Sequence, residues 1–187
     1  TREWIDKIRA MRLFDAGWEQ LRETIFANQK QLGVIPAETQ LTPWPDGQAE
    51  FGGARLPRWD TLSEIQKKTY IRQAEVFAAF AEYTDHEIGR MLKAFEEVGD
   101  ADNTLVFYIA GDNGTSGEGG QNGMFNEYTY FNGVQEKVED MLKLIDQWGG
   151  PETYPHMAAG WAVALDAPFA WMKQVPSDFG GTRNGMV

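Results

Sequence analysis

A run of six apolar residues followed directly by a glycine-rich polar loop constrains this chain more than any other stretch. Residues 105–110 read Leu-Val-Phe-Tyr-Ile-Ala, and residues 111–120 read Gly-Asp-Asn-Gly-Thr-Ser-Gly-Glu-Gly-Gly. An unbroken apolar run of β-forming residues is typical of a strand buried on both faces of a parallel sheet. In open α/β sheets, ligands bind in the loops at the carboxyl ends of such strands. The loop is therefore the leading candidate for a functional site.

Asp112 and Asn113 open the polar part of this loop. Adjacent carboxylate and amide oxygens suit a hard cation such as calcium or magnesium. Asn113-Gly114 is also a good tight-turn dipeptide, because asparagine and glycine both tolerate the backbone angles of turns. The EF-hand pattern fails here, since Gly114 stands where that pattern needs a second ligand. The spacing alone favours the turn and leaves a cation site open.

The composition of the chain limits the classes of partner. The 187 residues, 42% hydrophobic and 24% charged, have globular proportions and predict a single domain, residues 1–187. A formal net charge of −11 argues against nucleic acid as a partner, because binding to phosphates rests on clustered Lys and Arg. No apolar run approaches the length of a membrane span. The absence of cysteine excludes disulfides and thiolate nucleophiles within these residues.

Two helices are predicted ahead of the apolar run. Apolar residues at helical spacing indicate the first, from Trp18 to Leu32, with Asp15 as its N-cap and Gly33 as its stop. Residues 36–57 carry four prolines and three glycines, which predicts a long irregular loop.

The second helix is longer. Thr61 and Glu64 match a capping box, and apolar residues then recur in steps of three and four until Gly99. Asp85 interrupts this seam, which predicts a buried hydrogen bond from the helix to a loop. Because the helix precedes the predicted strand at 105–110, the order of elements favours an α/β fold with this seam packed on the sheet.

The chain after the loop carries one further helical pattern, at residues 134–148. Ser116 stands at a strand end like the serine of a nucleophile elbow, yet that motif needs glycine where Glu118 stands. With His86 and His156 as the only histidines, a histidine-rich metal site is excluded within these residues.

Residues 105–120 resemble the strand and metal loop of type I bacterial arylsulfatases, members of the alkaline-phosphatase-like superfamily. Residues 14–36, 84–90 and 149–185 resemble further parts of the same family, so the resemblance runs through nearly the whole chain. It implies an α/β sandwich in which helices flank a mostly parallel central sheet. It also implies that residues 1–187 are one part of that domain, truncated at both ends.

The resemblance carries roles onto individual residues of this chain. Asp112 and Asn113 match two ligands of a calcium ion that lies beneath the sulfate group. Lys173 matches a lysine that contacts the sulfate and stabilises the leaving oxygen, and His156 lies in a stretch that lines the pocket. Asp178 departs from the histidine that is common in the family, which implies an altered substrate preference or charge balance near the pocket.

The activity implied is that of a sulfuric ester hydrolase, the calcium-assisted hydrolysis of small-molecule sulfate esters. The family's nucleophile is a formylglycine made in a Cys/Ser-x-Pro-x-Arg motif, which these residues lack. We expect that motif in an N-terminal part outside them, and we expect the 187 residues alone to be inactive. The alternatives are a phosphodiesterase or phosphonate monoester hydrolase of the same superfamily, and a catalytically dead binding or structural module. The sequence leaves open the oligomeric state and a location in the bacterial cytoplasm or periplasm.

Overall fold

A computed structural model describes residues 2–45, 55–99, 101–111, 113–175, 179–183 and 185 of the chain. The regular elements within these ranges are α-helices and short 3-10 helices. The α-helices are α1 (Arg2–Met11), α2 (Trp18–Gln31), α3 (Glu64–Val98), α4 (Glu127–Phe131), α5 (Val138–Lys143) and α6 (Ala159–Leu165). The 3-10 helices are η1 (Trp59–Thr61), η2 (Ala101–Asn103), η3 (Ile145–Gln147) and η4 (Phe179–Gly181).

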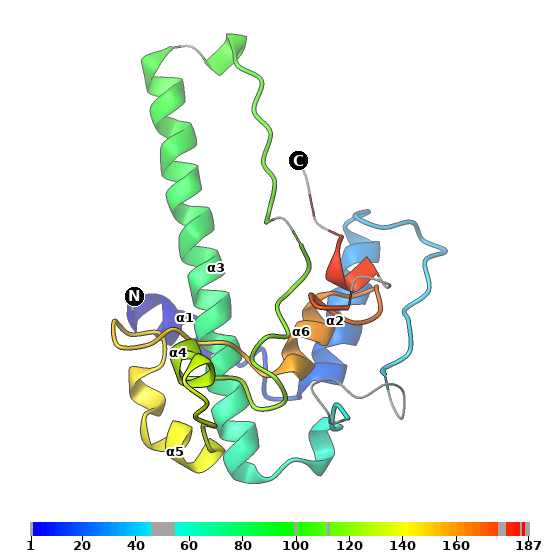
Figure 1. The fold of residues 1–187 in the computed structure, drawn as a ribbon. Helices are drawn as coiled ribbons and strands as arrows, with labels where there is room; N and C mark the ends of the chain where they lie inside the picture. Colours follow the sequence, from blue (N-terminus) through cyan, green and yellow to red (C-terminus); the bar gives the residue numbers. More distant parts are fainter. Residues whose placement is uncertain are drawn as a thin grey trace.

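The long helix α3 forms the axis of the structure (Figure 1). Helices α1 and α5 pack directly on α3, and α2 packs on α6 to form a second group of helices. From η2, at the far end of α3, residues 104–111 run back toward these helices as an extended segment (Figure 1). None of the helices in the described ranges has the length and apolar character needed to cross a membrane.

The ends of α3 are set by its capping residues. Ser63 is the N-cap, and its side chain and backbone exchange hydrogen bonds with Gln66 in a capping box. The capping box predicted at Thr61 and Glu64 is therefore wrong by two residues, because the Thr61 hydroxyl instead donates to the Arg58 carbonyl oxygen (2.6 Å). Gly99 ends the helix in the left-handed conformation (φ 87°), as predicted.

Helix α2 begins at a glycine rather than at the predicted aspartate. Gly17 is the N-cap, with φ 86°, and a Cβ atom there would lie 2.2 Å from the Trp59 ring. Asp15, the predicted N-cap, instead accepts a hydrogen bond from the Arg12 guanidinium (2.6 Å). The predicted stop at Gly33 is confirmed, because α2 ends at Gln31 and Gly33 follows with φ 72°.

The core is an aromatic cluster centred on Trp18, whose side chain is fully buried. The Trp18 ring meets the rings of Trp59 and Trp161 edge to face, with centroids 5.1 and 5.6 Å away, and stacks on Tyr70 at 6.0 Å. The Trp161 indole nitrogen donates to the Tyr70 carbonyl oxygen (2.8 Å), so its polar atom is satisfied. This cluster joins α2, η1, α3 and α6.

Gln73 is a buried polar residue that connects α3 to the loop and to α6. Its side-chain nitrogen donates to the Asn122 carbonyl oxygen (2.7 Å), and its side-chain oxygen accepts from the Ala158 N–H (2.8 Å). The Tyr70 hydroxyl donates to the Asn122 side chain (2.5 Å). The segment just after the glycine-rich loop and the start of α6 are thus held by the same face of α3.

The predicted buried strand at residues 105–110 is not formed among the described residues. The segment is extended but exposed, with Leu105 79% and Phe107 66% accessible to solvent. A buried strand needs neighbouring strands that pair with its backbone and elements that cover its faces. Within the described ranges, this segment makes one backbone hydrogen bond to a distant segment, from the Ala110 N–H to the Gly185 carbonyl oxygen (3.1 Å). The central sheet of the predicted α/β class is therefore not seen in this part of the chain.

The apolar seam of α3 is buried only near its start. Of the seam residues, Ala74 lies in the core and Ile71 and Ala78 pack partly buried against it. Phe95 is 49% exposed, because no sheet covers the second half of the helix within the described ranges. Asp85 is exposed, so the buried hydrogen bond predicted for it is wrong.

The predicted helix at 134–148 is shorter than the pattern indicated. It is divided into α5 and η3, which end before Trp148. Gly149 follows with φ 81°, and a Cβ atom there would lie 2.6 Å from the Val76 side chain. Helices α1, α4 and α6 were not predicted from the sequence. For α4 and α6 the reason is length, since they have only 5 and 7 residues and show less than two turns of periodicity.

We predict that Trp18→Ala destabilises the protein by about 3–5 kcal/mol, because it removes the central ring of the aromatic cluster and leaves a cavity. Leu32→Ala, at the exposed C-cap of the same helix, is the matched control and should change stability by less than about 0.5 kcal/mol. Denaturant unfolding measures both. Equal effects of the two substitutions would contradict the placement of Trp18 at the centre of the core.

Candidate functional site

The glycine-rich loop lies alongside the segment that carries Lys173. Ser116 and Lys173 pair as in a parallel ladder, and the Lys173 N–H donates to the Thr115 carbonyl oxygen (3.0 Å). Asn113, which is half-buried, lies two residues before Thr115. The structure thus brings together two regions that the sequence singled out separately, the loop and the segment of Lys173.

Two residues that the sequence singled out are not placed by the structure. Asp112, the other predicted metal ligand, and Asp178, the departure from the family's histidine, both lie outside the described residues. Their predicted roles therefore stay predictions.

A turn of two glycines closes the other side of the loop. The Gly114 N–H donates to the Gly181 carbonyl oxygen (3.2 Å), and the Gly180 N–H donates to the Ala170 carbonyl oxygen (3.1 Å). A Cβ atom on Gly114 would lie 1.6 Å from the Gly180 carbonyl oxygen. Position 114 therefore has no room for a side chain, because a backbone atom of η4 occupies the space that one would need.

Asp166, the C-cap of α6, connects that helix to the loop. One carboxylate oxygen accepts a hydrogen bond from the Thr115 N–H (2.9 Å). The other is buried and has no hydrogen-bond partner among the described residues. Burial raises the pKa of the Asp166 carboxyl to about 7, while the hydrogen bonds from Thr115 and the charge of Arg22 act in the opposite direction.

The ammonium group of Lys173 faces the carboxylate of Glu118, with 3.4 Å between Nζ and Oε1. Both side chains are partly exposed, at 36% and 41%. An ion pair as exposed as this contributes little to stability, because water screens it. The ammonium group can therefore exchange Glu118 for an anionic ligand at small energetic cost.

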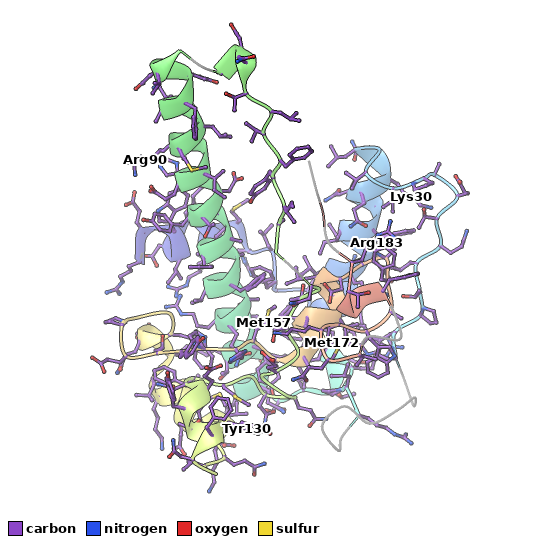
Figure 2. The ribbon with its side chains drawn as sticks, turned by 45° about the horizontal axis from the view of Figure 1, so that its top comes forward. Lys30, Arg90, Tyr130, Met157, Met172 and Arg183 are labelled. Atoms are coloured by element: carbon purple, nitrogen blue, oxygen red, sulfur yellow. The ribbon has the colours of Figure 1, made fainter. Side chains whose placement is uncertain are left out.

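His156 lines a groove that also includes Glu118, the partner of Lys173. Its backbone pairs with Met124 in both directions (2.9 Å each), and its Nε2 atom lies 2.8 Å from the Glu127 carboxylate. His156, Glu127 and Glu118 line one groove of about 1130 Å³. Tyr130 of α4 lies at the edge of the structure, and Met172, the residue before Lys173, is buried beside α6 (Figure 2).

Sequence reasoning missed three of these side chains. Asp166 and Glu127 follow no motif, because their roles depend on which distant segment each one meets. Glu118 was noticed only as a departure from the nucleophile elbow. Its pairing with Lys173 required the two segments to be placed side by side.

The residues of the loop fit a hard cation in part. Asp112 and Asn113 would offer carboxylate and amide oxygens, the ligand types that calcium takes, but calcium needs six to eight ligand oxygens. The described residues contain no group of three or more His, Cys, Asp or Glu side chains that could hold a metal ion. This chain would therefore supply only some of the ligands.

Comparison with known proteins identifies the family. The sulfatase family model matches residues 18–144, so the chain belongs to the sulfatase family. An uncharacterized sulfatase of Schizosaccharomyces pombe is 33% identical over 116 residues, covering 62% of this chain and 19% of that protein. An arylsulfatase of Klebsiella aerogenes is 24% identical over 185 residues, covering 99% of this chain and 36% of that protein.

The matched residues thus span between about a fifth and just over a third of the length of these relatives. Membership confirms the predicted sulfatase resemblance and implies an α/β fold of the alkaline-phosphatase-like kind. The sheet of that fold is not seen in the described ranges, which agrees with the exposed apolar segment at 105–109.

We predict that Gly114→Ala destabilises the protein by about 1–3 kcal/mol, because the new methyl group would overlap the Gly180 carbonyl oxygen. Gly89→Ala is the matched control. Gly89 lies inside α3, and no described neighbour lies within 4 Å of its Cβ position, so alanine there should stabilise the protein by about 0.5–1 kcal/mol. Denaturant unfolding of both variants checks the signs, and a neutral Gly114→Ala would contradict the close contact with η4.

Proposed function

We propose that the protein containing this chain hydrolyses small-molecule sulfate esters, with calcium held in part by Asp112 and Asn113. Membership in the sulfatase family and the similarity to an arylsulfatase support the reaction class. The observation that carries the assignment is the pairing of Ser116 with Lys173, because it puts a cationic side chain beside the loop that would bind the metal.

Lys173 has the chemistry of a leaving-group stabiliser. Negative charge grows on the bridging oxygen as the ester bond breaks, so an ammonium group near that oxygen binds the transition state more strongly than the substrate. Glu118 lines the groove and holds the ammonium group beside it until an anion replaces the carboxylate. Calcium, when bound, would offset charge on the sulfate oxygens.

The groove beside Lys173 would hold the organic part of the ester. Its walls combine aromatic side chains such as Tyr130 and Phe131 with the paired His156 and Glu127. Flat apolar rings suit an aryl group, because they bury its surface. We assign His156 to this wall, where its ring nitrogen is already bonded to Glu127 rather than directed at Lys173.

The reaction class can be tested with the protein produced from its complete reading frame. We expect turnover of 4-nitrophenyl sulfate that is lost on chelation of calcium and restored by adding it, with far slower turnover of bis(4-nitrophenyl) phosphate. Faster hydrolysis of the phosphate diester would favour the phosphodiesterase alternative. No turnover of either ester by the calcium-loaded protein would favour a binding or structural module.

We predict that Lys173→Ala lowers kcat for aryl sulfates by about a hundred- to a thousand-fold, the usual effect of removing one preorganised charged group. The loss should be smaller for esters of strongly acidic phenols, whose leaving oxygens need less stabilisation. Lys143→Ala is the control, since Lys143 is an exposed residue of α5 that pairs with Asp140, away from the groove. Steady-state kinetics across a series of leaving groups measures both variants.

An equal, small effect of both lysine substitutions on every ester would place Lys173 outside the reaction site. A raised KM with unchanged kcat would mean that Lys173 binds the substrate and transition state equally.

A further inference from the structure

Thr115 is held through both of its backbone groups. Its N–H donates to the Asp166 carboxylate (2.9 Å), and its carbonyl oxygen accepts from the Lys173 N–H (3.0 Å). Asp166 and Lys173 belong to one continuous segment that leaves α6, so both contacts anchor the loop to the same support. Thr115 follows Asn113 by two residues, and these contacts therefore limit how far Asn113 can move.

The turn after α6 that contains Asp166 is fixed by several hydrogen bonds. The Asp166 N–H donates to the Ala162 carbonyl oxygen (3.1 Å), and its own carbonyl oxygen accepts from the Phe169 N–H (3.0 Å). The buried guanidinium of Arg22 donates to the carbonyl oxygens of Val163 (3.3 Å) and Phe169 (2.8 Å). The backbone on both sides of Asp166 is thus fixed to α2.

The carboxylate of Asp166 lies near the charge of Arg22, yet only one of its oxygens has a hydrogen-bond partner among the described residues. Its second oxygen is buried without a partner among the described residues and would lie 3.3 Å from a Cβ atom on Gly114. Burying an oxygen in this way is unfavourable. A role in holding the loop explains why a side chain with a hydrogen-bond acceptor occupies this place.

We propose that Asp166 is a positioning residue that fixes the loop bearing Asn113 relative to Lys173, so that a metal-bound sulfate and the ammonium group meet in one geometry. This inference rests on the function proposed above. It concerns the backbone of the loop, since Asp166 contacts Thr115 rather than a proposed metal ligand.

The test uses the protein from its complete reading frame and compares Asp166→Ala with Asp166→Asn. Alanine removes the acceptor of the Thr115 N–H, whereas the asparagine side-chain oxygen can still accept it. Gln29→Ala is the matched control, because Gln29 donates to the Ala167 carbonyl oxygen (2.9 Å) in the same turn, on the side of α2. The readouts are hydrogen exchange of the loop amides, calcium affinity, and kcat with KM.

We expect Asp166→Ala to speed amide exchange at residues 113–116 and to weaken calcium binding by about tenfold or more, the usual range for residues that orient ligands. It should lower kcat more than it changes KM. Asp166→Asn should recover most of each loss, and Gln29→Ala should leave all three readouts near those of the wild type.

Unchanged exchange at the loop in Asp166→Ala would overturn the inference, as would an equal defect in Asp166→Asn. Hydrogen exchange decides this point even in a protein without sulfatase activity, so a failure of the proposed function is distinguishable from a failure of the positioning role. If Asp166→Ala does not fold, Asp166→Asn and Asp166→Ser, which differ in reach, still separate a hydrogen-bonding role from one of charge.

Discussion

The buried guanidinium of Arg22 is the interaction on which the rest of this structure depends. It is only 3% exposed, and it donates to backbone oxygens of Val163 in α6, Phe169 in the turn after α6, and Thr42 in the irregular segment. Burial lowers the pKa of this guanidinium, and the nearby Asp166 opposes that shift. A buried arginine is stable only when its donors are satisfied, so the three segments must meet around it.

The candidate site follows from this arrangement. Because the turn after α6 is fixed on α2, the residues that leave it, including Asp166 and Lys173, have defined positions. The glycine-rich loop then fits between this segment and η4, where Gly114 allows the backbones to approach closely. The aromatic cluster around Trp18 and the contacts of Gln73 hold the remaining side. The contacts that stabilise the fold are thus the same contacts that position the residues of the proposed site.

The sequence predicted the parts of this structure that depend on local signals. The stops at Gly33 and Gly99 were identified correctly, because glycine at a helix end has a local conformational cause. The strand at 105–110 was not seen, since its burial requires neighbours that the described residues do not provide. No sequence motif marks Asp166, because its role arises from its contact with Thr115, which lies 51 positions earlier in the sequence.

The most direct test of the central claim is a crystal structure of the calcium-loaded protein with bound sulfate. We expect calcium within about 2.3–2.6 Å of side-chain oxygens of Asp112 and Asn113, and the Lys173 ammonium within hydrogen-bond distance of the sulfate instead of paired with Glu118. A calcium ion bound elsewhere, with Lys173 still paired to Glu118 and no anion between Lys173 and the loop, would contradict the account.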